Sequence, residues 1–137
     1  MLDHWVWSRF LSASYYEHPP MVAFLIRFIT TIAGHHETSL EIGAQLVNLA
    51  IIYLIFRLAL SIFHTQAALF TLLVLSSMPY FTLGTVFLHI TQPFVFCWVL
   101  ALMLLVRYHR EPHPRWLIFI GVVCGLGALS KFIMLLF

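Results

Sequence analysis

A short polar segment, residues 15–20, holds the side chains of this sequence that are best suited to chemistry. It reads Tyr-Tyr-Glu-His-Pro-Pro, so the carboxylate of Glu17 stands beside the imidazole of His18. Such a pair is suited to moving a proton and to holding an anion. Pro19 and Pro20 restrict the backbone before them and allow a helix to begin, which would hold both side chains at a fixed angle. The alternative is a solvated turn without a chemical role.

Lys131 is the second candidate, because it follows a long apolar run. An ionisable side chain inside a membrane-spanning segment is costly and indicates a functional site by default. Counted from Arg115 at 1.5 Å per residue, Lys131 lies about 24 Å along its segment, near the opposite leaflet. The alternative is a lysine whose ammonium extends to the interface near a helix end.

The other potential ligands give weaker signals. His35, His36 and Glu37 lack a histidine pair at i, i+4, so we interpret them as an interfacial loop and predict no metal site. Cys97 and Cys124 lie in apolar runs without CxxC spacing. We expect them to be small buried apolar residues at different depths.

The composition indicates a membrane protein. Hydrophobic residues make up 62% of the chain and charged residues only 9%, whereas a soluble domain carries roughly 25% charged residues. The net charge of +2 is small and scattered, which argues against nucleic-acid binding. The chain has room for a few crossings of about 20 apolar residues each.

The apolar runs predict an all-α integral membrane protein with about four transmembrane helices, preceded by two interfacial juxtamembrane helices. The predicted interfacial helices cover residues 1–14 and 20–33, and a tilted span is the alternative for the second of them. The predicted spans cover residues 40–63, 67–87, 93–106 and 116–137, and we expect Pro79 and Gly84 to distort or end the second span near residue 87. Ser39 and Glu41 are typical of the start of the first span. We expect one partial membrane domain over residues 1–137, with the juxtamembrane helices and loop in 1–38 and the transmembrane helices in 39–137.

The basic connection at residues 107–115 predicts the orientation. Its three arginines favour the cytoplasmic side, and Arg57 near the inner end of the first span agrees. The N-terminal segments then lie outside. The polar residues expected to gather at the outer face are Glu17, His18, His35, His36, Glu37, Glu41, His89 and Gln92, together with Lys131.

Two motifs are shared with a known family. One is the segment at 15–20, preceded by Trp-Val-Trp-Ser-Arg at 5–9 and followed by Met-Val-Ala-Phe-Leu-Ile-Arg at 21–27. The other is Gly-Leu-Gly-Ala-Leu-Ser-Lys-Phe at 125–132. In these motifs and in the order of its apolar segments, the chain resembles the polyprenol-dependent membrane glycosyltransferases of the GT-C fold, of the protein mannosyltransferase and aminoarabinose transferase type.

The resemblance implies transfer of a sugar from a polyprenyl-phosphate donor to a lipid, glycan or protein acceptor. The transfer is expected to occur at the outer, periplasmic face of the cell inner membrane, in a multi-pass protein. Glu17 is the candidate catalytic carboxylate. The residues expected to bind substrate are Tyr16, His18, His89, Gln92 and Lys131. The expected partners are membrane lipids and the polyprenyl-phosphate-linked sugar, with no nucleic acid, and a divalent cation is left open.

The chain also departs from the family pattern. The main catalytic acid of the family lies in an Asp-Glu motif before the first tryptophan, and Asp3 is too close to Trp5 to align with it. Gln92 stands where a second acid is usual, and Gln45 stands where many relatives carry arginine. The first transmembrane helix and the C-terminal half of the family are also absent. We therefore expect a fragment, truncated at both ends, that is inactive on its own.

A different class of function is a non-catalytic multi-pass protein, such as a transporter module or an assembly subunit. Against a transporter, residues 40–87 and 93–137 show no internal repeat. A flippase-like or polymerase-like relative is another enzymatic alternative. An apolar span followed by Asp-Glu, in frame upstream of Met1, would favour the transferase.

Overall fold

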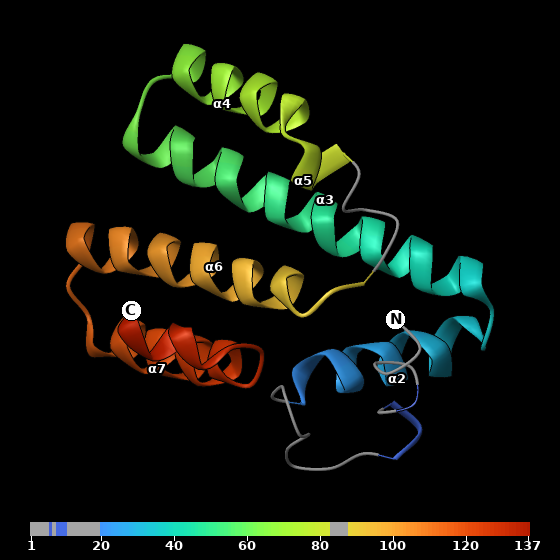
Figure 1. Cartoon of the computed structure of the whole chain (residues 1–137). Helices are drawn as coiled ribbons and strands as arrows, with labels where there is room; N and C mark the ends of the chain where they lie inside the picture. Colours follow the sequence, from blue (N-terminus) through green and yellow to red (C-terminus); the bar gives the residue numbers. More distant parts are fainter. Residues whose placement is uncertain (1–5, 7, 11–19, 83–87) are drawn as a thin grey trace.

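The structure, a computed structural model, describes residues 6, 8–10, 20–82 and 88–137. All regular secondary structure in these residues is helical (Figure 1). The helices are α2 (Met21–Ala33), α3 (Glu37–Ile62), α4 (Thr65–Ser77), α5 (Pro79–Thr82), α6 (Thr91–Arg110), α7 (Pro114–Ala128) and the 3-10 helix η1 (Phe132–Leu136). The predicted all-α class is confirmed for this part of the chain. The predicted helix over residues 1–14 lies mostly outside it.

Two helices, α3 and α6, are long and apolar enough to cross a membrane. They contain 26 and 20 residues and correspond to the first and third predicted spans. The next longest apolar helix, α7, has 15 residues. At 1.5 Å per residue it reaches about 22 Å, short of the roughly 30 Å of the hydrocarbon layer. The length criterion therefore supports two of the four predicted spans.

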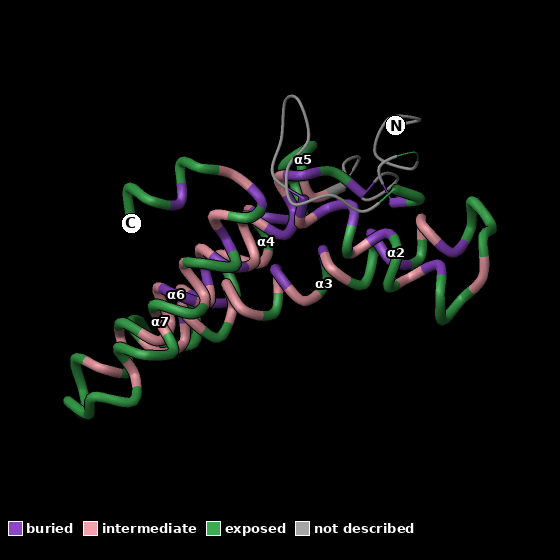
Figure 2. Tube along the Cα trace, turned by 90° about the horizontal axis from the view of Figure 1, so that it is seen from below, coloured by how far each residue is buried: buried purple, intermediate pink, exposed green. Residues whose placement is uncertain are grey.

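The side chains of α4 and α7 are largely exposed. Figure 2 shows α7 mostly exposed, and Gly127 is its one buried residue. Ile118 and Val122 of α7 are 67% and 54% exposed, and Phe70 of α4 is 65% exposed. Apolar surface of this extent needs an apolar solvent or further protein to cover it. Lipid contact satisfies that requirement.

The start of the first span differs from the prediction. α3 begins at Glu37, which places an acid in its first turn, where the helix dipole favours it. The hydroxyl of Ser39 donates to the carbonyl of Ala33 at 2.8 Å. Ser39 therefore joins α3 to the end of α2 and does not cap α3. Between the helices, Gly34 adopts a φ of +83°, as expected for a residue that ends a helix.

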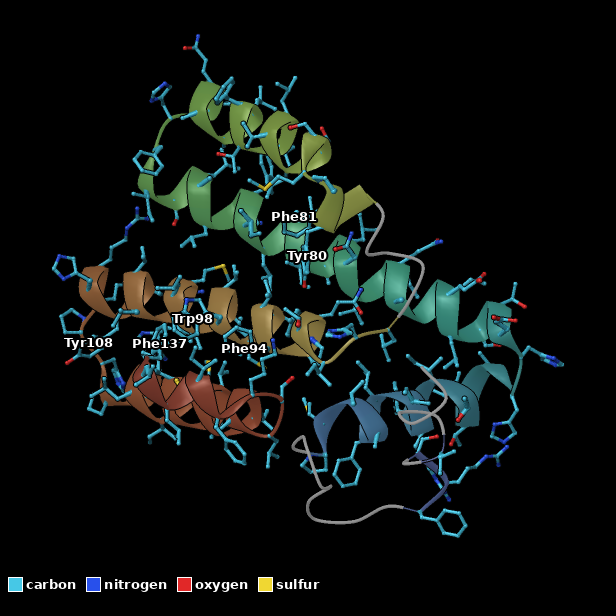
Figure 3. All side chains as sticks on the ribbon, in the orientation of Figure 1. Tyr80, Phe81, Phe94, Trp98, Tyr108 and Phe137 are labelled. Carbon is cyan, nitrogen blue, oxygen red and sulfur yellow. The ribbon has the colours of Figure 1, made fainter. Side chains whose placement is uncertain are left out.

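The predicted continuous span over residues 116–137 is wrong. α7 ends at Ala128, the chain turns at residues 129–130, and η1 folds back against α6 and α7. The rings of Phe137 in the returning segment and Trp98 in α6 meet edge to face, with centroids 5.3 Å apart (Figure 3). At Gly127 a Cβ atom would come within 2.8 Å of Met134 Cγ, so the glycine makes room for this return.

The second predicted span is divided. α4 ends at Ser77, and Pro79, which has no amide proton, starts the single turn of α5. The buried amide of Asn48 in α3 donates to the carbonyl of Phe81 at 3.1 Å and holds α5 against α3. The predicted end of this span, at residues 83–87, lies outside the described part of the chain.

We expect Asn48→Leu to release α5 from α3. Hydrogen bonds between helices in a membrane contribute about 0.6 kcal/mol on average, so a small drop in thermal stability should accompany faster chymotrypsin cleavage after Tyr80 or Phe81. Thr71→Val is the matched control, because the Thr71 hydroxyl bonds only within α4, to Ala67. Equal cleavage of the two variants would rule out this tether.

The helices form antiparallel pairs. α3 and α6 run in the same direction, with α4 antiparallel to α3 and α7 antiparallel to α6 (Figure 1). One buried cluster joins α2, α3 and the residues around the start of α6, namely Val22, Ile26, Ala44, Leu88 and Ile90. A second joins Cys97, Ala101 and Met134, with Cys124 packed beside it. The cysteines therefore share one layer as free thiols, and the expectation of different depths is wrong.

Candidate functional site

The chain reversal after α7 places Lys131 at the N-terminal end of α6. Its backbone is extended (φ −148°, ψ 132°), so it belongs to neither α7 nor η1. The ammonium donates to Thr91 Oγ1 at 3.0 Å and lies 5.8 Å from the ring centroid of Phe94. Lys131 is thus held by tertiary contacts with the first turn of α6. It is not a residue of a continuous helix whose side chain extends to the interface.

A short hydrogen-bond chain continues from Lys131 to His89. Thr91 Oγ1 lies 3.1 Å from His89 Nδ1, and the backbone N–H of Thr91 donates to the same nitrogen at 3.3 Å. An ammonium can only donate, so the threonine oxygen accepts from Lys131 and its own proton points to Nδ1. Nδ1 accepts from the backbone N–H of Thr91. The exposed imidazole of His89 is thus joined through Thr91 to the ammonium of Lys131.

Gln92 fixes the backbone beneath this pair. Its side-chain oxygen accepts from the backbone N–H of His89 at 3.2 Å, and its backbone N–H donates to the carbonyl of His89 at 3.0 Å. The side chain is buried, with 3% of its surface exposed. The contact makes Gln92 a positioning residue for His89, and its predicted binding of substrate stays a prediction.

Ser130 is a residue whose role we did not predict, although it belongs to the second motif. Its hydroxyl is buried and donates to the carbonyl of Ile90 at 2.6 Å. On the other side of the turn, the amide of Met21 donates to the carbonyl of Leu129 at 2.9 Å. These bonds join the starts of α2 and α6 to the turn that carries Lys131.

Tyr16, Glu17 and His18 lie outside the described residues, so their contacts are not tested. The described chain resumes at Pro20, which is buried, and the next residue is the one bonded to Leu129. The polar segment that we singled out therefore directly precedes a point of contact with the Lys131 turn.

An apolar cavity of about 390 Å³ lies next to this turn. Its wall includes Met21, Pro93 in the first turn of α6 and Leu126 near the end of α7. The other lining residues come from α2, α3, α6 and α7: Leu25, Leu46, Val47, Ala50, Phe96, Cys97, Leu100 and Val123. Lys131, Thr91 and His89 do not line this space, which is suited to a hydrocarbon chain. It lies near them because Met21 bonds to Leu129 and Pro93 follows Thr91 by two residues.

The dolichyl-phosphate-mannose-protein mannosyltransferase family model matches residues 17–137. The chain belongs to this family. Among curated proteins it is similar to the lipid A galacturonosyltransferase RgtD of Rhizobium johnstonii, with 23% identity over 134 residues. The alignment covers 97% of this chain and 28% of that protein, so the chain spans less than a third of the relative's length. No solved structure matches.

Membership in this family confirms the resemblance noted in the sequence. The match begins at Glu17 and extends through Lys131 to the end of the chain. It therefore includes the candidate carboxylate, His18 and the whole described site at the start of α6. Tyr16 and the aromatic segment before it lie outside the matched residues.

The hydrogen bonds described above for Lys131, Thr91 and Gln92 do not involve the polar residues at the start of α3. Leu40, which stands beside Glu41 in the sequence, packs against the cluster that contains Ile90, and Ala44 belongs to that cluster. His35 and His36 are exposed near this end of α3, and Glu41 is half-buried. Within the described ranges, no three His, Cys, Asp or Glu side chains come together as potential metal ligands.

Three arginines lie at the opposite end of α3 and α6. Arg57, Arg107 and Arg110 line one cavity there. The predicted orientation stays a prediction. The predicted loop over 107–115 is shorter than expected, because Arg107–Arg110 form the last turn of α6. Basic side chains in a last helical turn are favoured by the helix dipole.

Proposed function

We propose that this chain is part of a membrane glycosyltransferase that takes its sugar from a polyprenyl-phosphate carrier. The observation that carries the proposal is the Lys131–Thr91 contact beside the apolar cavity. A lipid phosphate has an anionic head on a hydrocarbon chain, and this part of the structure offers a cation next to an apolar space. The family match supports the same class of donor.

In the proposed reaction, Glu17 takes the proton of an acceptor hydroxyl while the oxygen of that hydroxyl bonds to the anomeric carbon of the sugar. The bond from that carbon to the phosphate oxygen breaks, and the electron pair leaves with the polyprenyl phosphate. Lys131, His18 and His89 stabilise the negative charge that develops on the phosphate. The acceptor is a lipid, a glycan or a protein.

The proposed location is the inner membrane, with the site at its periplasmic face. The support is the separation of charge along the helices. Arg57, Arg107 and Arg110 lie together at one end, and positive side chains favour the cytoplasmic side. Lys131 contacts the opposite end of α6, which then faces the periplasm.

The donor class can be tested with the full-length protein in proteoliposomes. We expect a radiolabelled sugar to reach the acceptor from a polyprenyl-phosphate donor and not from the corresponding nucleotide sugar. The labelled product is measured after separation from the donor. Equal transfer from the nucleotide sugar would overturn the donor assignment. Movement of the intact donor across the bilayer, without covalent product, would identify a transporter instead.

A further inference from the structure

A second polar site lies at the other end of the α3–α6 pair, and the proposed transfer reaction does not use it. Arg57 and Ser61 of α3 and Arg107 and Arg110 of α6 line a cavity of about 280 Å³. Met103, Leu104 and Val106 supply its apolar wall, and Glu111 also lines it. The helix dipole accounts for basic residues in the last turn of α6. It does not account for the convergence of Arg57 from α3.

Aromatic rings hold two of these guanidinium groups. Arg107 lies over the ring of Trp116, with its Cζ 4.6 Å from the ring centroid. Arg57 donates to the hydroxyl of Tyr53 at 3.1 Å and lies 5.9 Å from the centroid of that ring. Stacking uses the face of a guanidinium and leaves N–H groups at its edge, which match the oxygens of a phosphate.

Nearby acids do not neutralise these arginines. In the described part of the chain, no carboxylate forms an ion pair with Arg57, Arg107 or Arg110, although Glu111 borders the same cavity. Three cations facing one cavity repel each other. An anion with several oxygens placed among them attracts all three and offsets that repulsion. The charge arrangement therefore indicates a phosphate-bearing ligand.

The surroundings of the cavity distinguish a lipid from a small anion. A shallow, mainly apolar depression of about 660 Å³ adjoins the cavity and shares Ser61, Val106 and Arg110 with it. Its other walls include Ile62 and Leu105, which are 51% and 44% exposed. A phospholipid could place its phosphate among the arginines and the start of an acyl chain in this depression. A free phosphate would use only the polar part.

We propose that the arginine pocket, formed by Arg57, Arg107 and Arg110, binds the head group of an anionic phospholipid. Basic pockets between transmembrane helices bind such head groups on the cytoplasmic side of membranes. The bound lipid would join the end of α3 to the end of α6. This inference is independent of the proposed sugar transfer, because no residue of the Lys131 site takes part in it.

The test measures lipid retained by the full-length protein in detergent, by native mass spectrometry, after exposure to equimolar phosphatidylglycerol and phosphatidylcholine. We expect the wild type to retain phosphatidylglycerol preferentially. Arg110→Gln should reduce that retention about five-fold, which is the usual contribution of one arginine near an anionic surface. The double variant with Arg57→Gln and Arg110→Gln should reduce it about 25-fold. Arg115→Gln is the matched control, since Arg115 is an exposed arginine near the same end that does not line the cavity.

Three results would overturn the proposal. One is equal retention of the two lipids by the wild type, and another is an equal effect of Arg115→Gln and Arg110→Gln. The third is displacement of the lipid by an equal concentration of inorganic phosphate, which would assign the pocket to a small anion. A further test uses the wild-type protein alone, so it does not depend on the folding of a variant. Its preference for phosphatidylglycerol should fall as salt is added, and a preference unaffected by salt would count against the arginines.

Discussion

Lys131→Met in the full-length protein should lower the rate of sugar transfer by roughly 10²–10³-fold, the usual effect of removing one donor to a charge that develops in a transition state. Methionine keeps an unbranched side chain that can still pack against Phe94, but it removes the ammonium that now donates to Thr91. The loss should appear mainly in kcat, because the phosphate gains negative charge as the sugar leaves.

Two further variants separate the charge of Lys131 from its hydrogen bond. Lys131→Arg keeps the charge and should retain much of the activity. Thr91→Val removes the oxygen that joins Lys131 to His89. It should lower the rate of sugar transfer about 10-fold, as expected for the loss of a single hydrogen bond to a charged group. Each variant must reach the membrane and melt at a temperature near that of the wild type. Transfer by Lys131→Met within two-fold of the wild type would remove Lys131 from the site.

Replacing Glu17 or His18 by Ala should also abolish most of the transfer, without loss of membrane insertion. A positioned acid or base contributes about 10²–10⁴-fold to a rate, and Glu17 is the carboxylate proposed to take the acceptor proton. His18→Ala should have the smaller effect, because Lys131 and His89 also face the proposed phosphate position. Initial rates with a polyprenyl-phosphate sugar donor measure both changes.

Matched controls for Glu17 and His18 come from the start of α3 and the residue before it. Glu41→Gln and His36→Ala alter the same kinds of side chain, and neither residue is among the contacts of Lys131. They should leave transfer near the wild-type rate. If Glu17→Ala and His18→Ala both kept full activity in this assay, the segment at 15–20 would have no chemical role.

Much of the fold could be predicted from local sequence alone. The low content of charge and the long apolar runs indicate helices in a membrane, and α3 and α6 appear within a few residues of the predicted spans. The helix predicted over residues 20–33 appears as α2, which ends at Ala33 and is followed by Gly34. Such features depend on neighbouring residues, through hydrophobic length, backbone freedom and helix ends.

The site also shows what local sequence could not reveal. Residues 116–137 satisfy the length and composition of a span, yet Ser130 and Lys131 bond to Ile90 and Thr91, forty positions earlier in the chain. Periodicity does not detect a bond between distant segments. That Lys131 and His89 are scarce polar groups in an apolar chain is visible in the amino-acid sequence. That a reversal after α7 joins them through Thr91 depends on the folded chain, because a buried hydroxyl and a partly buried ammonium in an apolar environment must find partners wherever the chain offers them.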